Sequence, residues 1–487
     1  MVFSSHVFIF YFLPVALLVY YVLLPFRWPR HFTLTLLSYI FYGWANPRFV
    51  VLMFFNTLVD YIAGLVQAHN GFRGWSKEPP LLEKGAARSR TQKIALIASI
   101  STNLSLLAFF KYFNFAYDNY AALASWLGVP GTAFENAMRV TLPLGISFYT
   151  FQSMSYSIDV YRGDTRAMRS ANDFFCYVAM FHQLVAGPIV RFSEIADQLK
   201  ARRHSIDKFA RGVALFSLGL TMKVLLANPC GKIADTVFDA NAVSTLDAWY
   251  GTVAYSLQIL FDFSGYSEMA IGLGLMMGFV FAKNFETPYQ SQSITEFWRR
   301  WHISLSTWLR DYLYVPLGGN RKGARRTYIN LFLTMLLGGL WHGASWNFLL
   351  WGGLHGSALA VERYGGRGAF LERWPRLLRV AWTFGIVLIG WVFFRARDLP
   401  AAFAHLQSMS GLREVPDSAG LIAGIIYQPY YLICFAIAAT VAWRFPTAWA
   451  WTQQLTGVKA CACMALLWLS LVMLATQEYN PFIYFIF

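Results

Sequence analysis

The sequence predicts an all-α polytopic membrane protein with about 10 to 12 transmembrane helices, some of them short or re-entrant. Three observations support this prediction. Of the 487 residues, 57% are hydrophobic and only 13% are charged. Apolar segments of about 20 residues, the length that crosses a bilayer, recur from one end of the chain to the other. Lys and Arg cluster between these segments, as they do in cytoplasmic loops of membrane proteins.

Each apolar segment is a candidate helix, and several are too short to cross alone and are predicted as half-helices or re-entrant segments. In chain order the segments are 7–26, 31–45, 48–68, 94–112, 141–160, 174–190, 211–228, 249–282, 329–349, 350–362, 380–394, 421–443 and 457–476. The first has neither a basic n-region nor a small-residue cleavage site, so it is predicted to be a retained span. Because no linker or soluble region interrupts the series, we expect a single domain over residues 1–487.

The distribution of charge predicts the orientation. Placing Arg27 and Arg30 in the cytoplasm puts the N-terminus outside, and alternation then returns 70–93, 162–173 and 283–326 to the cytoplasm. Basic residues flank both ends of 174–190, which predicts a re-entrant segment. The net charge of +15 is spread over such loops, so it indicates contact with membrane lipids and argues against nucleic acid as a partner.

Residues 294–312 have the pattern of an amphipathic helix. Apolar and aromatic residues from Ile294 to Tyr312 recur at spacings of three and four, which is one face of a helix, and charged residues occupy the rest. A helix of this composition is predicted to lie in the cytoplasmic interface, with Trp at headgroup level. His302 is one residue off the apolar stripe and is predicted to reach toward Trp298 or Ser306.

His342 is an ionisable residue inside the apolar run 329–361. Such a residue at membrane depth is costly unless it lines a cavity or has a partner, so it marks a candidate site. The surrounding Gly338-Gly-Leu-Trp-His-Gly343 is echoed by Gly352-Gly-Leu-His-Gly356. On a continuous helix the two histidines point about 220° apart, and only a break near 346–351 brings them together. The glycines are also explained by close helix packing.

Five scattered cysteines, including Cys461 and Cys463, show no paired metal-ligand spacing, so no metal site is predicted. Asp262 and Tyr266 share one face of the segment 249–282. An Asp in the membrane needs a partner, and we expect an Arg or His on a neighbouring helix. Asp262 and Tyr266 are thus candidates for supporting the site or for handling protons beside it.

Several motifs together resemble the membrane-bound O-acyltransferase (MBOAT) family, most closely its members that O-acetylate exported polysaccharides such as alginate. They are Leu142-Pro-Leu-Gly-Ile-Ser-Phe-Tyr-Thr-Phe-Gln152, Ile158-Asp-Val-Tyr-Arg-Gly163, Val185-Ala-Gly-Pro-Ile-Val-Arg-Phe192, Phe261-Asp-Phe-Ser-Gly-Tyr266, Ser293-Ile-Thr-Glu-Phe-Trp-Arg-Arg-Trp-His-Ile-Ser304, Leu317-Gly-Gly-Asn-Arg-Lys-Gly323 and Gly338-Gly-Leu-Trp-His-Gly343. The resemblance covers residues 1–395, and 396–487 match only as hydrophobic helices.

The resemblance implies a ring of tilted helices around a thinned centre, in the bacterial inner membrane. It also implies transfer of an acetyl group from a cytoplasmic thioester, such as acetyl-CoA, to an exported polysaccharide, with periplasmic or membrane-anchored acetyltransferase partner proteins. His342 matches the family's near-invariant histidine and His302 its second one, so both are candidate catalytic residues. No bound cofactor is predicted.

Thioester chemistry needs a proton acceptor, and a neutral imidazole, with a reference pKa of about 6.5, suits His342 as general base; a transient acyl-histidine is the alternative. His302 is predicted to polarise the thioester carbonyl or to bind the donor near the cytoplasmic mouth. Candidate ligands of the donor's phosphates are Arg299, Arg300, Arg310, Asn320, Arg321 and Lys322. A proton-coupled transporter and a non-catalytic export scaffold remain as alternatives.

Overall fold

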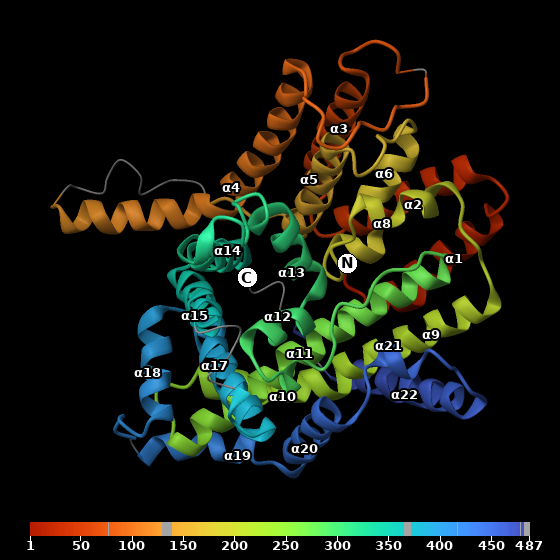
Figure 1. The fold of residues 1–487 in the computed structure, drawn as a ribbon. Helices are drawn as coiled ribbons and strands as arrows, with labels where there is room; N and C mark the ends of the chain where they lie inside the picture. The colour runs from red at the N-terminus through yellow and green to blue at the C-terminus, as the bar shows by residue number, and fades with distance from the viewer. Residues whose placement is uncertain (76, 129–138, 365–371, 416, 478, 482–487) are drawn as a thin grey trace. The chain divides into compact units, whose positions relative to one another are not determined.

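The computed structural model describes residues 1–487 except 76, 129–138, 365–371, 416, 478 and 482–487. Every regular element in the described part is a helix (Figure 1), which confirms the all-α prediction. The chain divides into two compact units. Unit 1 comprises Met1–His204 and Met277–Phe281, and unit 2 comprises Ser205–Met276 and Ala282–Phe487. A single domain over 1–487 stays a prediction.

Unit 1 is built around three helices, α3, α4 and α5, that pack against one another. Its elements are the π-helix η1 (Val7–Phe12), α1 (Leu13–Val22), α2 (Arg27–Gly43), α3 (Arg48–His69), α4 (Arg90–Trp126), α5 (Ile146–Arg162), α6 (Ala171–Ala179), α7 (Phe181–Leu184) and α8 (Phe192–Lys200). At 37 residues, α4 is about 55 Å long at 1.5 Å per residue, longer than a hydrocarbon core.

A buried carboxylate joins these three helices. Asp60 on α3 is fully buried, and it accepts hydrogen bonds from Ser99 Oγ at 2.5 Å and from Asn103 Nδ2 at 2.9 and 3.0 Å, both on α4. Ser157 on α5 adds a third donor at 3.4 Å. Because polar groups in an apolar interior are costly unless they are hydrogen-bonded, this cluster specifies how α3, α4 and α5 meet.

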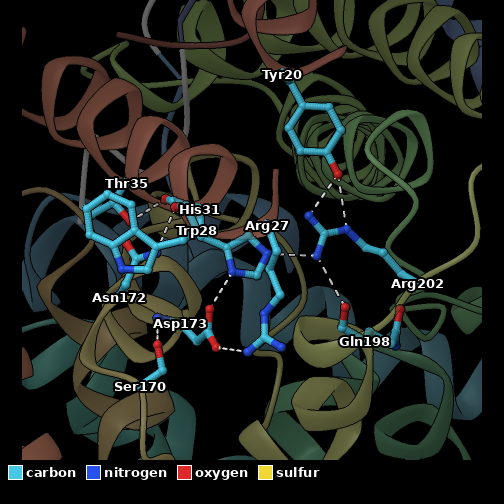
Figure 2. A network of polar contacts seen from close by, with 10 residues as sticks. All are labelled: Tyr20, Arg27, Trp28, His31, Thr35, Ser170, Asn172, Asp173, Gln198 and Arg202. Carbon is cyan, nitrogen blue, oxygen red and sulfur yellow. Dashed lines mark hydrogen bonds and ion pairs between the residues drawn. The ribbon is translucent and has the colours of Figure 1, made fainter. Parts of the chain in front are cut away.

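A second polar network ties α1, α2, α6 and the segment after α8 together within unit 1 (Figure 2). Asp173 forms an ion pair with Arg27 and accepts from His31 Nδ1 at 2.6 Å. Nε2 of His31 lies 3.0 Å from Arg202 Nη1, and Arg202 also donates to the Tyr20 hydroxyl at 2.8 Å. Since a guanidinium only donates, Nε2 of His31 is the acceptor and Nδ1 carries the proton.

Unit 2 contains the long helix α11 and the antiparallel pair α14 and α15. Its elements are α9 (Ile206–Thr221), η3 (Met222–Ala227), α10 (Asn228–Phe238), α11 (Thr245–Met276), η4 (Pro288–Gln290), α12 (Ile294–Arg300), α13 (Ile303–Leu309), η5 (Arg310–Tyr314), α14 (Gly323–His342), α15 (Trp346–Arg363), α17 (Arg376–Arg395), α18 (Leu399–Met409), η6 (Asp417–Ile422), α19 (Ala423–Ile426), α20 (Pro429–Arg444), α21 (Ala448–Trp451) and α22 (Gly457–Thr476).

Glycines let the helices of unit 2 approach closely. A Cβ atom at Gly219 on α9 would lie 2.4 Å from the carbonyl oxygen of Gly265 on α11. A Cβ atom at Gly339 on α14 would lie 2.2 Å from the carbonyl oxygen of Phe348, and one at Gly352 on α15 would lie 2.5 Å from that of Met335. Small residues at such positions allow backbone contact between membrane helices. Packing therefore explains these glycines of the repeated Gly-Gly-Leu pattern.

Five helices in the described residues are long and apolar enough to cross a membrane: Arg48–His69, Arg90–Trp126, Ile206–Phe238, Arg376–Arg395 and Gly457–Thr476. A sixth results if Gly420–Ile426 and Pro429–Arg444, bent by 68°, form one broken span. The predicted 10 to 12 crossings also count helices such as α11 and α14, which carry buried polar groups or a basic first turn. That number stays a prediction.

Two predicted segments differ in detail from the helices observed. Residues 174–190 contain most of α6, a helix of nine residues, and all of α7, a helix of four. Both are too short to cross a bilayer, and the re-entrant course of this segment stays a prediction. The continuous amphipathic helix predicted over 294–312 is wrong. It breaks at Trp301 and His302 because His302 adopts φ = +43°, a left-handed conformation that α-helices do not contain.

We expect Gly219→Val to destabilise unit 2 by about 3 kcal/mol or more, because a Cβ atom there overlaps the backbone of α11. The measurement is the thermal midpoint of the detergent-solubilised protein. Gly385→Val on α17 is the matched control, since a Cβ atom at Gly385 meets nothing within 4 Å. Equal midpoints for the two variants would contradict the close contact.

Candidate active site

His342 is the last residue of α14 and lies against aromatic side chains of unit 2. Its ring is edge-on to Trp341, Trp351 and Phe394, with centroid distances of 4.9, 5.0 and 5.2 Å. It is partly accessible. At 1.5 Å per residue, His342 lies about 28 Å along α14 from Gly323.

A tight reversal after His342 returns the chain along α14. Gly343 packs so closely on the Phe348 ring that a Cβ atom would lie 2.1 Å from it. Ser345 caps α15 by accepting from the Asn347 backbone N–H at 3.2 Å. Asn347 Nδ2 then donates to the Ala396 carbonyl oxygen at 2.7 Å, which fixes the start of α15 relative to the end of α17.

This reversal brings the two glycine-flanked histidines to one aromatic cluster. Trp351 lies 5.0 Å from both the His342 and the His355 rings, centroid to centroid. The sequence allowed this meeting only if the helix broke near 346–351, and the break occurs at 343–345. His355 itself is fully buried, so His342 is the more accessible of the two.

His302 also contacts Trp341 of this cluster. The His302–Trp341 centroid distance is 6.5 Å, and its ring is edge-on to Phe263 of α11 at 4.6 Å. The predicted neighbours Trp298 and Ser306 are therefore replaced by Phe263 and Trp341, because the helix breaks at His302 and turns its side chain. The two candidate catalytic histidines are thus both in contact with Trp341.

Asn284 holds the turn that carries His302. Its backbone carbonyl accepts from the Ile303 N–H at 2.9 Å, and its side-chain oxygen accepts from the Ser304 N–H at 3.1 Å. His302 Nδ1 lies 3.3 Å from that same oxygen, so Nδ1 carries the proton and donates. Sequence reasoning missed Asn284, because it precedes the 294–312 pattern by ten residues.

The environment of His302 keeps it uncharged. The residue is fully buried, and burial lowers its pKa to about 3. Nε2 has no hydrogen-bond partner among the described residues. With the proton on Nδ1, this nitrogen presents a lone pair, and a ligand that bonds to it must be a hydrogen-bond donor.

Asp262 does not join the histidines. Its Oδ1 lies 2.8 Å from Lys223 Nζ of η3, and both side chains are 3% exposed. Lys223 also donates to the carbonyl oxygen of Pro481. The predicted partner on a neighbouring helix exists, but it is a Lys rather than an Arg or His. Tyr266 is buried on the same helix as Asp262.

The predicted donor-binding residues fall into two groups. Arg300 is paired with Glu296 at 2.6 Å and Arg310 with Asp311 at 2.6 Å, and Asn320 accepts from the Tyr314 hydroxyl. By contrast, the exposed side chains of the second group have no acidic partner among the described residues; they are Arg299, Arg321 and Lys322.

Aromatic residues build most of the cluster walls, and sequence reasoning did not assign several of them. Trp391 lies 5.0 Å from Trp301 and 5.4 Å from Phe394, centroid to centroid. The 18 tryptophans of the chain are the signal that points to such a cluster, but tryptophans also occur at membrane interfaces, so composition alone does not locate it.

Comparison with known proteins identifies the family of the chain. The sequence profile of the membrane-bound O-acyltransferase family matches residues 164–395, which include His302 and His342. A probable alginate O-acetylase AlgI of Pseudomonas putida is 43% identical over 508 aligned residues that span the full length of both chains. The probable alginate O-acetylase AlgI of Azotobacter vinelandii is 48% identical, over 84% of this chain and 78% of its own length.

A relative named for a different polymer is also similar. The peptidoglycan O-acetyltransferase of Helicobacter pylori is 36% identical, over 85% of this chain and 81% of its own length. The identity is therefore spread over most of the chain and extends well beyond the matched profile. The chain belongs to the membrane-bound O-acyltransferase family and is an O-acyltransferase.

Proposed function

We propose that this protein transfers an acetyl group from a cytoplasmic thioester, such as acetyl-CoA, across the bacterial inner membrane for O-acetylation of alginate or another exported polysaccharide. Identity of 43 to 48% to probable alginate O-acetylases supports alginate as the acceptor. Periplasmic or membrane-anchored acetyltransferase partners complete the transfer to the polymer, since this chain contains no Gly-x-Ser-x-Gly site.

The observation that carries the proposal is the accessibility of His342. Of the three histidines in the aromatic cluster, His302 and His355 are fully buried, whereas His342 retains accessible surface. A general base must reach the proton that it removes. His342 is therefore the histidine that can meet a substrate at membrane depth.

The proposed reaction needs no cofactor. The imidazole of His342 takes the proton of the acceptor hydroxyl while the oxygen attacks the thioester carbonyl carbon. The tetrahedral intermediate then collapses, the carbon–sulfur bond breaks, and the thiolate receives the proton from His342. The walls formed by Trp341, Trp351 and Phe394 limit access of water, which would otherwise hydrolyse the thioester.

We propose that His302 binds the donor. Of the two roles left open by the sequence, polarising the carbonyl requires an N–H, whereas Nε2 of His302 presents a lone pair. A lone pair suits an amide N–H or hydroxyl of a pantetheine arm. Asp262 is neutralised by Lys223, so we assign Asp262 and Tyr266 to supporting α11 rather than to a proton relay. That pairing also weakens the transporter alternative.

We expect His342→Ala to reduce acetylation of the secreted polysaccharide by about 10²-fold or more, the range in which general bases contribute. The measurement is acetyl content per uronate, together with membrane abundance of the variant. His6→Ala is the control, because His6 is exposed and lies near the N-terminus, far from His342 in the sequence. Normal acetylation by His342→Ala at normal abundance would remove His342 from the chemistry.

His302→Asn is expected to raise the KM for the thioester donor severalfold while the pH profile of kcat keeps its shape. Burial holds the pKa of His302 near 3, so the residue is neutral throughout pH 5–9 and contributes no titration there. Asn is chosen because it tolerates the left-handed backbone at this position. A displaced pH profile would show instead that His302 titrates during turnover.

A double variant Arg321→Ala/Lys322→Ala is expected to raise the KM for acetyl-CoA by about tenfold, because each exposed cation contributes a charge-assisted contact to phosphate. Acetyl-pantetheine lacks the nucleotide phosphates and serves as the control donor. Its KM is expected to stay unchanged. An equal increase for both donors would mean that the loop acts through the fold rather than through phosphate.

A further inference from the structure

Unit 1 contains a cavity that the proposed acyl-transfer chemistry does not use. It has a volume of about 500 Å³ and lies between the start of α2, the segment from α5 to α6, and α8. Four cationic side chains line it: Arg27, Arg166, Arg169 and Lys200. The distribution of charge predicts that two parts of this lining, Arg27 and the segment 162–173, lie on the cytoplasmic side.

The cavity carries unmatched positive charge. Three carboxylates also line it, of Asp173, Glu78 and Asp197. Asp173 is already paired with Arg27 and hydrogen-bonded to His31, so its charge is neutralised within the buried network of Figure 2. Four cationic side chains and three carboxylates line the cavity, so the lining as a whole carries one excess positive charge.

Three of the four cations are available to a ligand. Arg166, Arg169 and Lys200 are exposed, and none has an acidic partner in the described part of the chain. Arg27 is held by Asp173 but keeps 47% of its side chain exposed. Guanidinium groups bind phosphate through two parallel hydrogen bonds, and Lys adds a point charge.

The surroundings of the cavity are those of a membrane interface. Trp28 follows Arg27 directly and is 62% exposed, and its ring is stacked on that of Phe32 at 5.4 Å. Phe26, on the other side of Arg27, is 61% exposed. Aromatic side chains of this kind lie at the level of the lipid headgroups, and basic pockets beside them bind anionic headgroups.

We propose that this cavity binds a phosphate group, carried by an anionic phospholipid of the surrounding bilayer. The buried pairing of Asp173 with His31 and Arg27 fixes α2 against α6 and so shapes the floor of the cavity. The guanidinium groups of Arg166 and Arg169 and the ammonium of Lys200 contact the phosphate oxygens. The site is independent of the proposed acetyl transfer.

The test measures binding of phosphatidylglycerol or cardiolipin to the full-length protein in neutral detergent. Native mass spectrometry detects the bound lipid. We expect bound lipid on the native protein and at least tenfold weaker binding to Arg166→Ser/Arg169→Ser/Lys200→Ser. Arg73→Ser/Lys77→Ser/Lys93→Ser is the control, because it removes the same charge from exposed positions of unit 1 outside the cavity.

A parallel titration with coenzyme A identifies the source of the phosphate. Loss of lipid binding with unchanged coenzyme A binding supports the phospholipid. Loss of coenzyme A binding alone supports a phosphate site but overturns the lipid as its occupant. If the cavity variant binds lipid as tightly as the control variant does, and also binds coenzyme A as tightly, the proposal is overturned altogether.

Discussion

The geometry of the candidate active site depends on the sharp reversal of the chain between α14 and α15. If α14 continued past His342 as one helix, His355 would point to another face. The rings of His342 and His355 would then not both contact Trp351. The reversal is possible because Gly343 accepts the Phe348 ring where any side chain would collide, and because Gly339 and Gly352 let the returning helix lie directly on the outgoing one. The glycine-flanked motifs therefore determine both the close packing of α14 on α15 and the placement of the two histidines beside Trp351.

Two buried carboxylates, one in each unit, are satisfied by other parts of the protein in different ways. Asp60 is surrounded by hydroxyl and amide donors, whereas Asp262 is neutralised by a cation. Both solutions avoid an unpaired charge in an apolar interior. His302 and His355 follow the same logic by remaining uncharged. His342 differs because it keeps contact with accessible space, which suits a residue that exchanges protons with a substrate.

Much of this could be predicted from the sequence, for identifiable reasons. The apolar segments predicted an all-α membrane protein because spanning length is a property of each segment alone. His342 stood out because an ionisable residue in an apolar run is rare. The break at His302 could not be predicted, because the apolar spacing of 294–312 continues across it and only contacts with Asn284 and Phe263 impose the turn. The choice of Lys223 as partner of Asp262 likewise depends on how distant helices meet.

The contact between Lys223 and Pro481 has a consequence for how the protein is made. The two residues are separated by 258 positions, so the ammonium enters the membrane long before its carbonyl partner exists. At about 5–20 residues per second, the ribosome needs roughly 13–50 s to cover that distance, whereas Asp262 emerges within about 2–8 s. The carboxylate can thus neutralise the charge early, and the contact of Lys223 with Pro481 forms only after that pairing.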